Sequence, residues 1–306
     1  MKGTLVMMVG AVWILTGSIA SAQTRGGPPG GPPGGTAAVA AGYLHEFGTA
    51  ISGGGDFKVS RFFVSADVMG ATGSKTALGV ALTYDLEEFT FSGPSGLAAP
   101  APWGTIHRFG FSPSLLHSIS PDWRILVAPS IGTAGEVGAD PGDALVYGAV
   151  LSATKTIGPD LSLGLGTGVF RQIEQWRVFP FLFVRWRIND RWKLSNSLRV
   201  GPAGPAGLEL AYIIDGNWEA AAGGAYRSYR FRLDEDGTVP GGIGEVRGTP
   251  LFARLTRTWR HGWKADLYAG VVMGGKLALE NGHGDTIGSA SFDPAPLASL
   301  IVTRKF

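Results

Sequence analysis

The chain has 306 residues, of which 16% are charged and 44% hydrophobic, and it contains 48 glycines, 19 prolines and no cysteine. So much glycine disfavours a helix-rich fold, because each interior glycine costs about 1 kcal/mol relative to alanine, and the absence of cysteine excludes disulfides, thiolate metal sites and cysteine nucleophiles. A net charge of +2 gives no electrostatic support for nucleic-acid binding, so the composition favours a large, glycine-rich all-β chain.

The first 22 residues have the pattern of a secretory signal peptide. Lys2 is followed by an apolar stretch from Leu5 to Leu15, and Ala20-Ser21-Ala22 matches a small-residue cleavage site. We favour cleavage over a retained anchor because a spanning helix needs about 20 apolar residues. Residues 23–36, rich in Gly-Gly-Pro-Pro, are predicted to be a flexible tether before a single domain at 37–306.

Beyond residue 37, large apolar residues recur at every second position. Between residues 78 and 87, Leu78, Val80, Leu82 and Tyr84 lie on one face, and the other face is small, polar or acidic. Such alternation indicates strands with two different environments. We predict strands at about 38–47, 57–69, 76–91, 105–119, 123–133, 145–157, 161–171, 177–188, 192–200, 207–214, 218–233, 246–260, 263–280 and 294–306.

Short and long connections alternate along this series. The short ones carry tight-turn sequences such as Ser120-Pro121-Asp122 and Asp215-Gly216-Asn217. The long ones, rich in Gly, Pro and Ala, lie at about 48–56, 92–104, 134–144, 172–176, 201–206, 234–245 and 281–293. Trp123, Trp192, Trp218 and Trp263 each follow a short turn, which favours an interfacial tryptophan girdle over four separate core tryptophans.

The two faces of the strands suggest a membrane barrel. An apolar face turned to lipid and a charged face turned to a wet lumen fit a transmembrane barrel, whereas a soluble sandwich would have to bury the same apolar face in its core. If both ends of the chain lie on the short-turn side, the strand number is even. We therefore predict a closed antiparallel β-barrel of 14 strands, with 12 as the fallback, and with short periplasmic turns and longer extracellular loops.

At its C-terminus the chain resembles Gram-negative outer-membrane β-barrel proteins. It ends with Ala298, Leu300, Val302 and Phe306 at alternating apolar positions, and Arg304 departs from the pattern. The resemblance implies a cell outer-membrane location, outer-membrane lipid as surroundings, and Phe306 as an insertion signal read by the barrel-assembly machinery. The resemblance is to a barrel family of no established role, so it implies no substrate.

The inner face offers charged candidate functional residues. Basic residues gather around one short turn, and acids on other strands could pair with them; the lumen-facing candidates are Arg185, Arg187, Lys193, Arg199, Glu209, Glu219 and Asp266. A salt-bridge network that braces the wall and a mildly anion-selective pore are both consistent with this set. The leading hypothesis is a passive channel or transporter for small solutes or hydrophobic molecules, and the alternative is a non-conducting structural or surface-interaction barrel.

Catalytic and cofactor chemistry has little support. The five histidines have no metal-ligand spacing, and Gly164-Leu165-Gly166-Thr167-Gly168 lies within a strand with no helix after it, unlike a nucleotide loop. An outer-membrane enzyme remains a remote alternative, with His117 near Ser114 and Ser118 as its nearest candidates. We therefore expect no cofactor, no metal, no catalytic residue and no nucleic-acid partner.

Overall fold

The structure is a computed structural model that describes residues 35–99, 101–196 and 207–306. The predicted signal peptide and nearly all of the tether lie outside these residues. The strands are β1 (Thr36–Ala50), β2 (Asp56–Ala71), β3 (Thr76–Ser92), β4 (Thr105–Ser118), β5 (Trp123–Glu136), β6 (Leu145–Ile157), β7 (Leu161–Gln172), β8 (Gln175–Arg187), β9 (Trp192–Ser195), β10 (Leu208–Ile213), β11 (Trp218–Gly224), β12 (Arg227–Arg232), β13 (Ile243–Thr258), β14 (Trp263–Glu280), β15 (Thr286–Phe292) and β16 (Ala295–Lys305). A short 3₁₀ turn, η1 (Arg260–Gly262), joins β13 to β14. No helix in the described ranges is long and apolar enough to cross a membrane.

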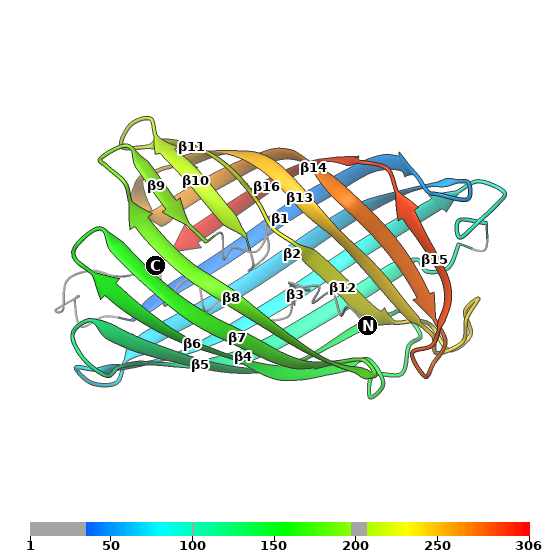
Figure 1. Cartoon of the computed structure of the whole chain (residues 1–306), viewed down its shortest axis with the longest axis horizontal. Coiled ribbons are helices and arrows are strands. Elements are labelled where there is room, and N and C mark those ends of the chain that lie inside the picture. Colours follow the sequence, from blue (N-terminus) through cyan, green and yellow to red (C-terminus); the bar gives the residue numbers. More distant parts are fainter. Residues whose placement is uncertain (1–34, 100, 197–206) are drawn as a thin grey trace, which may run out of the picture.

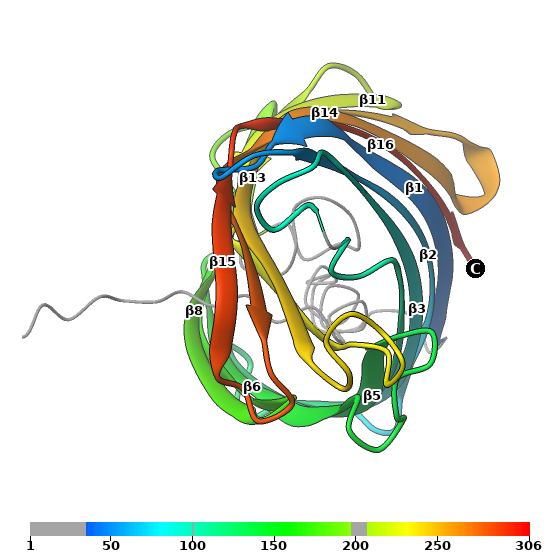
Figure 2. The same ribbon diagram turned by 90° about the vertical axis from the view of Figure 1, so that its right-hand side faces the viewer.

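The strands close into a barrel of 14 antiparallel strands (Figures 1 and 2). Successive strands pair around the ring, and β1 pairs with β16 to complete it. The register of β11 on β13, with Gly224 opposite Leu251, continues into β12, with Arg227 opposite Gly248. Likewise β15 and β16 share one register on β14. These two interrupted strands reduce the sixteen segments to the predicted 14, and the 12-strand fallback was wrong.

Three details of the predicted strand map needed correction. The predicted loop at 172–176 is a two-residue turn, in which Ile173 (φ 36°) and Glu174 (φ 64°) both have positive φ, as in the hairpin turns that match strand twist. The predicted loop at 281–293 contains β15, and the predicted strand 218–233 is interrupted at Ala225 and Tyr226. Of the predicted strand 192–200, β9 covers 192–195, and residues 197–200 lie outside the described ranges.

The alternation of the strands separates an exposed apolar face from a buried face. On β3, Leu78, Leu82 and Tyr84 are exposed, while Asp85 and Glu87 are buried. Since β3 is part of a closed wall, the buried side chains point into the barrel and the exposed apolar ones point away from it. The predicted assignment of the two faces of this strand is confirmed.

Glycines on the inner face make room for phenylalanine rings. Gly166 and Gly168 on β7 lie directly opposite Phe181 and Phe179 on β8. A Cβ at either glycine would overlap the facing ring, so each ring lies against bare backbone. Glycines facing aromatic residues across strands are a known way to stabilise sheets of this kind. The small inner residues that the sequence places on β7 therefore serve to seat aromatic side chains.

A cluster of apolar side chains fills the barrel at the end that carries most of the longer loops. Part of the β3–β4 connection folds inward (Figure 2) and buries Trp103, whose ring lies 5.4 Å from the ring of Phe231 on β12. All six residues of β12 are buried, and Arg232 at its end bridges to Gly135 of β5. We call this group, centred on Trp103 and Phe231, the mouth cluster. It narrows the barrel at that end.

Candidate functional site: charged networks in the lumen

Charged side chains of the inner wall form three networks between the two ends of the barrel. Each contains three cations and three carboxylates, and Glu174 of one network also pairs with a fourth cation, Arg171, at 3.0 Å. The lower network, nearest the short turns, comprises Lys193, Glu209, Glu219, Arg254, Lys264 and Asp266. The middle network comprises Glu46, Arg61, Asp85, Glu87, Arg108 and Arg227. The upper network, nearest the mouth cluster, comprises Glu174, Arg177, Arg230, Arg232, Glu245 and Glu280.

Arg254 is the centre of the lower network. Its guanidinium contacts Glu209 through two nitrogens, at 2.9 and 2.5 Å, Glu219 at 2.7 Å and Asp266 at 3.1 Å. Lys193 pairs with Glu219, and Lys264 pairs with Asp266. Four predicted lumen residues, Lys193, Glu209, Glu219 and Asp266, are thus brought together through an arginine that the sequence analysis did not single out.

The middle network joins strands from opposite parts of the chain. Arg61 donates from Nε to Asp85 (2.7 Å), and Arg108 lies 2.6 Å from Glu87. Arg227 of β12 pairs with Glu46 of β1. Tyr229 lies between them, because its hydroxyl accepts a hydrogen bond from Arg61 (2.9 Å) and its ring lies 4.4 Å from the Arg108 guanidinium.

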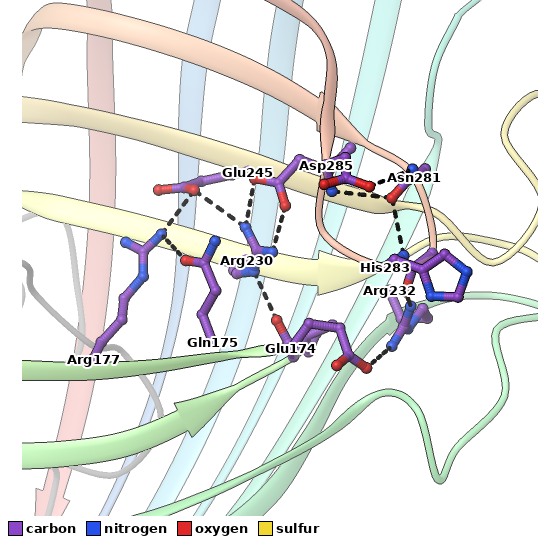
Figure 3. Close-up of polar contacts among 12 residues, drawn as sticks. Glu174, Gln175, Arg177, Arg230, Arg232, Glu245, Asn281, His283 and Asp285 are labelled. Carbon is purple, nitrogen blue, oxygen red and sulfur yellow. Dashed lines mark hydrogen bonds and ion pairs between the residues drawn. The ribbon is translucent and has the colours of Figure 1, made fainter.

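The upper network fastens β12 to its surroundings (Figure 3). Arg230 donates to both carboxylate oxygens of Glu280, at 2.8 and 2.5 Å, in the bidentate geometry that gives the stronger ion pairs. Arg177 of β8 lies 2.9 Å from Glu245 of β13, and Arg232 lies 3.1 Å from Glu174 of the β7–β8 turn. Side chains therefore tie β12 and β13 to the upper end of β8.

Three further cations, Arg124, Arg185 and Arg187, lie near the short turns of β5 and β8. Arg187 has a side chain that is 68% exposed and lies 3.8 Å from Asp160. Arg185 donates to the hydroxyl of Ser162 at 3.3 Å. Arg124 and Arg185 have no carboxylate within 4.0 Å among the described residues, and they line one recess of the inner wall. Predicted residue Arg199 lies outside the described ranges.

The four tryptophans of the predicted girdle each close a short turn with the same backbone hydrogen bond. In each turn the residue four positions earlier donates its backbone N–H to the tryptophan carbonyl, at 2.9 to 3.0 Å. Trp123, Trp218 and Trp263 each carry a cation near the ring, namely Lys155, Arg257 and Arg304, and each cation lies directly opposite on the neighbouring strand. Trp192 instead faces Tyr212, with ring centroids 4.9 Å apart.

Arg304, the residue that departs from the expected C-terminal pattern, lies beside two aromatic rings. The Arg304 guanidinium lies 5.4 Å from the Trp263 ring and 5.2 Å from the Phe306 ring. The Phe306 backbone N–H bonds to the carbonyl of Ala37, and its side chain is 71% exposed.

Several network residues escaped the sequence analysis for a physical reason. In β12, Arg230 and Arg232 were not predicted to face inward; together with Arg227 they occupy both parities, and all three are buried because the segment is covered on both sides. A period of two cannot identify the inner face of such a segment. The inward position of Arg254 could have been predicted from the sequence, because Phe252, Arg254 and Thr256 alternate with Leu251 and Leu255, which are exposed.

The remote enzymatic candidates do not come together. The Nδ1 atom of His117 lies 2.9 Å from the hydroxyl of Thr76, and no bond to Ser114 or Ser118 is formed. Among the residues that the structure describes, no group of three or more His, Asp or Glu side chains could hold a metal ion.

Comparison with known proteins gives a family and a set of barrels. A family model described as a domain of unknown function (DUF6268) matches residues 70–238. No curated protein matches the chain. Solved structures that resemble it include the COG4313 outer membrane channel from Pseudomonas putida F1 (11% identity, 92% of this chain and 99% of that chain, TM-score 0.48). Others are a Pseudomonas aeruginosa FadL homologue (10%, 96% and 99%, TM-score 0.47) and the Pseudomonas putida toluene transporter TodX (9%, 96% and 95%, TM-score 0.46).

Proposed function

The chain belongs to the DUF6268 family of unknown function, and we propose that it is an outer-membrane channel for small solutes or small hydrophobic molecules. The charged inner wall carries this proposal. An eight-stranded barrel is filled by its own side chains, and a barrel of 14 strands is wider. Its inner face bears eighteen ionisable groups in the three networks, an arrangement that is costly in a dry core and ordinary in a polar barrel interior.

The outer wall supports the membrane part of the proposal. Leu78, Leu165 and Leu267 are 49 to 71% exposed, as lipid-facing residues would be. The signal peptide and the reading of Phe306 by the assembly machinery belong to the same proposal. Cell fractionation together with heat-modifiable migration tests it: recovery as a soluble periplasmic protein would contradict the proposed location.

The upper network and the mouth cluster suggest that the channel is closed at rest. Arg230 of β12 pairs with Glu280 at the end of β14, and Phe231 of the same strand packs on Trp103. Passage through this end requires β12 or the loop with Trp103 to move. The proposed channel is therefore gated, with the Arg230–Glu280 pair holding it shut.

The same cluster favours the second candidate function, a non-conducting barrel. A permanently packed mouth would leave the loops of that end as a contact surface and the networks as internal braces. Weakening the Arg230–Glu280 pair should open a gated channel, whereas it should leave a permanently packed barrel closed.

Planar bilayer recordings of the full-length protein separate the two candidates. We expect low conductance for the wild type and more frequent openings for Glu280→Gln, which removes the negative charge facing Arg230. Glu88→Gln is the matched control, because Glu88 is exposed on the outer face of β3. If wild type and Glu280→Gln both fold, as judged by heat-modifiable migration, and neither conducts, the protein is a non-conducting barrel.

A further inference from the structure

Two arginines lie on the outer face of the barrel, where their neighbours are apolar. Arg257 of β13 shares a face with exposed Leu255, and Arg304 of β16 shares a face with exposed Leu300. Near the short turns, every other outward position of β11, β13, β14 and β16 is alanine, glycine or a larger apolar residue. A charge on a lipid-facing wall is costly at the membrane centre and is tolerated near the interface.

Aromatic rings, and not carboxylates, surround these two guanidinium groups. The Arg257 guanidinium lies 4.6 Å from the Trp218 ring and 5.9 Å from the Trp259 ring, and Arg304 likewise contacts two rings. One nitrogen of each, Nε of Arg257 and Nη1 of Arg304, is buried without a hydrogen bond. Within the described part of the chain neither arginine has a carboxylate within 4.0 Å, and Asp215 of the nearby turn accepts backbone N–H groups instead. Neither positive charge is therefore paired within this wall.

An open groove lies beside Arg257 on the same face. The groove has a volume of about 310 Å³, at the lower end of the roughly 300–1,000 Å³ of small-molecule sites. The short side chain of Ala265, directly opposite Arg257 on β14, forms its floor. Leu255, Leu267 and Leu300 lie directly opposite one another on β13, β14 and β16, and they are 40 to 54% exposed. The groove thus offers accessible apolar surface next to an unpaired cation.

The height of the groove on the barrel indicates which ligand can contact both parts. Trp218, Trp259 and Trp263 lie at the short-turn end, and tryptophan side chains favour the membrane–water interface. Lipid phosphates lie at this level, and arginine suits them because its planar guanidinium can donate two parallel hydrogen bonds. The three leucines lie further from the short turns, toward the membrane centre. One ligand with a phosphate and an attached alkyl chain would therefore contact the arginines and the leucines together.

We propose that this surface binds one anionic phospholipid of the periplasmic leaflet. Arg257 and Arg304 contact its headgroup, and an acyl chain lies in the groove over Ala265. A free phosphate would leave the groove empty, and a second copy docked through the same wall would bring two more arginines and no acid. The proposal rests on the membrane part of the proposed function, and it does not depend on whether the barrel conducts.

Native mass spectrometry of the full-length protein in a non-ionic detergent, titrated with dioleoyl phosphatidylglycerol, tests the site. We expect one lipid to stay bound, and its dissociation constant to rise about tenfold or more in Arg257→Met, as for the loss of a charge-assisted hydrogen bond. Arg304→Met should weaken binding in the same direction. Since neither arginine has a carboxylate beside it in the described ranges, both variants should keep the heat-modifiable migration of the wild type.

Two further variants separate the charge from the groove. Arg191→Met is the matched control, because Arg191 lies in another short turn and donates to the Tyr212 hydroxyl at 2.7 Å. It should change the dissociation constant less than about twofold. Ala265→Phe fills the groove and keeps both arginines, so it should also weaken binding. Unchanged binding in Ala265→Phe would contradict the placement of the acyl chain and overturn the proposal.

Four other outcomes would overturn it. Dioleoyl phosphatidylcholine bound as tightly would show that the headgroup charge is not recognised, and displacement of the lipid by inorganic phosphate would show a plain anion site. Equal losses in Arg191→Met and Arg257→Met would show a general charge effect, and a dimer that excludes the lipid would assign the surface to a second copy. Bilayer recordings keep the two proposals apart: lipid binding without conductance in wild type or Glu280→Gln removes only the channel, and conductance without lipid preference removes only this site.

Discussion

Cations on the two sides of this lumen have different surroundings. In the three networks, which draw mainly on β1–β4 and β9–β14 and take in Arg177 at the upper end of β8, each arginine or lysine contacts a carboxylate. Arg254 contacts three. In the sector β5–β8, Arg124 and Arg185 lie near hydroxyl and apolar side chains. The same residue type therefore occurs in two settings: a paired arginine joins strands, while one without an acid beside it holds no carboxylate in place.

The energetic consequences of losing a cation differ accordingly. Removing one partner of a buried pair leaves the other as an uncompensated charge, which is costly. Removing an arginine that has no acid beside it leaves no such charge behind. Stability should therefore depend more on the paired arginines than on the unpaired ones, and substitutions on the two sides test the comparison.

The largest effect is expected for Arg254→Met. This substitution leaves Glu209 and Asp266, both buried, without their arginine, and we expect the free energy of unfolding to fall by about 3–5 kcal/mol. Urea unfolding in lipid vesicles, followed by tryptophan fluorescence, measures it. Arg187→Met is the control, with an expected change within about 0.5 kcal/mol because its ion pair is exposed and long. Equal losses in the two variants would show that the lower network does not brace the wall.

A smaller decrease in the free energy of unfolding is expected for a substitution within the β5–β8 sector. Gly168→Ala places a Cβ where the Phe179 ring lies, and overpacking of this kind costs about 1–3 kcal/mol. In Gly70→Ala the new Cβ has no heavy atom within 4 Å, so the same substitution should have little effect there. The double variant Gly168→Ala with Phe179→Leu should lose less than the two single losses combined, because the smaller side chain removes the overlap. Additive losses in the same urea assay would contradict the proposed ring-on-glycine contact.

The strands of the β5–β8 sector and their two faces were also the most predictable from the sequence. Large apolar residues such as Ile125, Leu151 and Leu165 alternate with small or polar ones, and this contrast predicts both the strands and their faces. The sequence identified Arg185 as a lumen-facing candidate. It did not predict that Arg185 lies near Arg124, because β5 and β8 are separated by two strands. Their approach across the recess depends on the curvature of the closed wall, which a residue pattern does not contain.

The mouth cluster shows the opposite case. In β12 the residues Tyr229 and Phe231 share a face, and Ser228 and Arg230 share the other, yet all four are buried. Alternation of apolar and polar residues identifies the two faces of a strand only if one face contacts water and the other does not. A strand that is covered on both sides lacks this contrast. For the same reason the contact of Trp103 with Phe231 was not predicted, since it joins a loop to a distant strand.

The smallest expected effect concerns the short turn between β10 and β11, away from the lumen arginines. The Asp215 carboxylate accepts backbone N–H groups of Asn217 (2.7 Å) and Trp218 (2.8 Å), and these bonds hold the pKa of Asp215 below its usual 3.8. A lowered folded-state pKa means that this contribution to stability is complete above pH 3.8 and is lost as the pH falls through the lower value. The difference in urea midpoint between wild type and Asp215→Asn should therefore shrink as the pH is lowered from about 6 to about 2.

The turn between β8 and β9 supplies the reciprocal test. There Asn189 accepts the N–H groups of Arg191 and Trp192, both at 2.9 Å, with an uncharged side chain in the position of Asp215. Asn189→Asp should make that turn depend on pH in the same direction, because the new carboxylate would accept the same two donors. A difference between Asn189→Asp and wild type that stays constant over this pH range would show that the charge adds nothing to the turn.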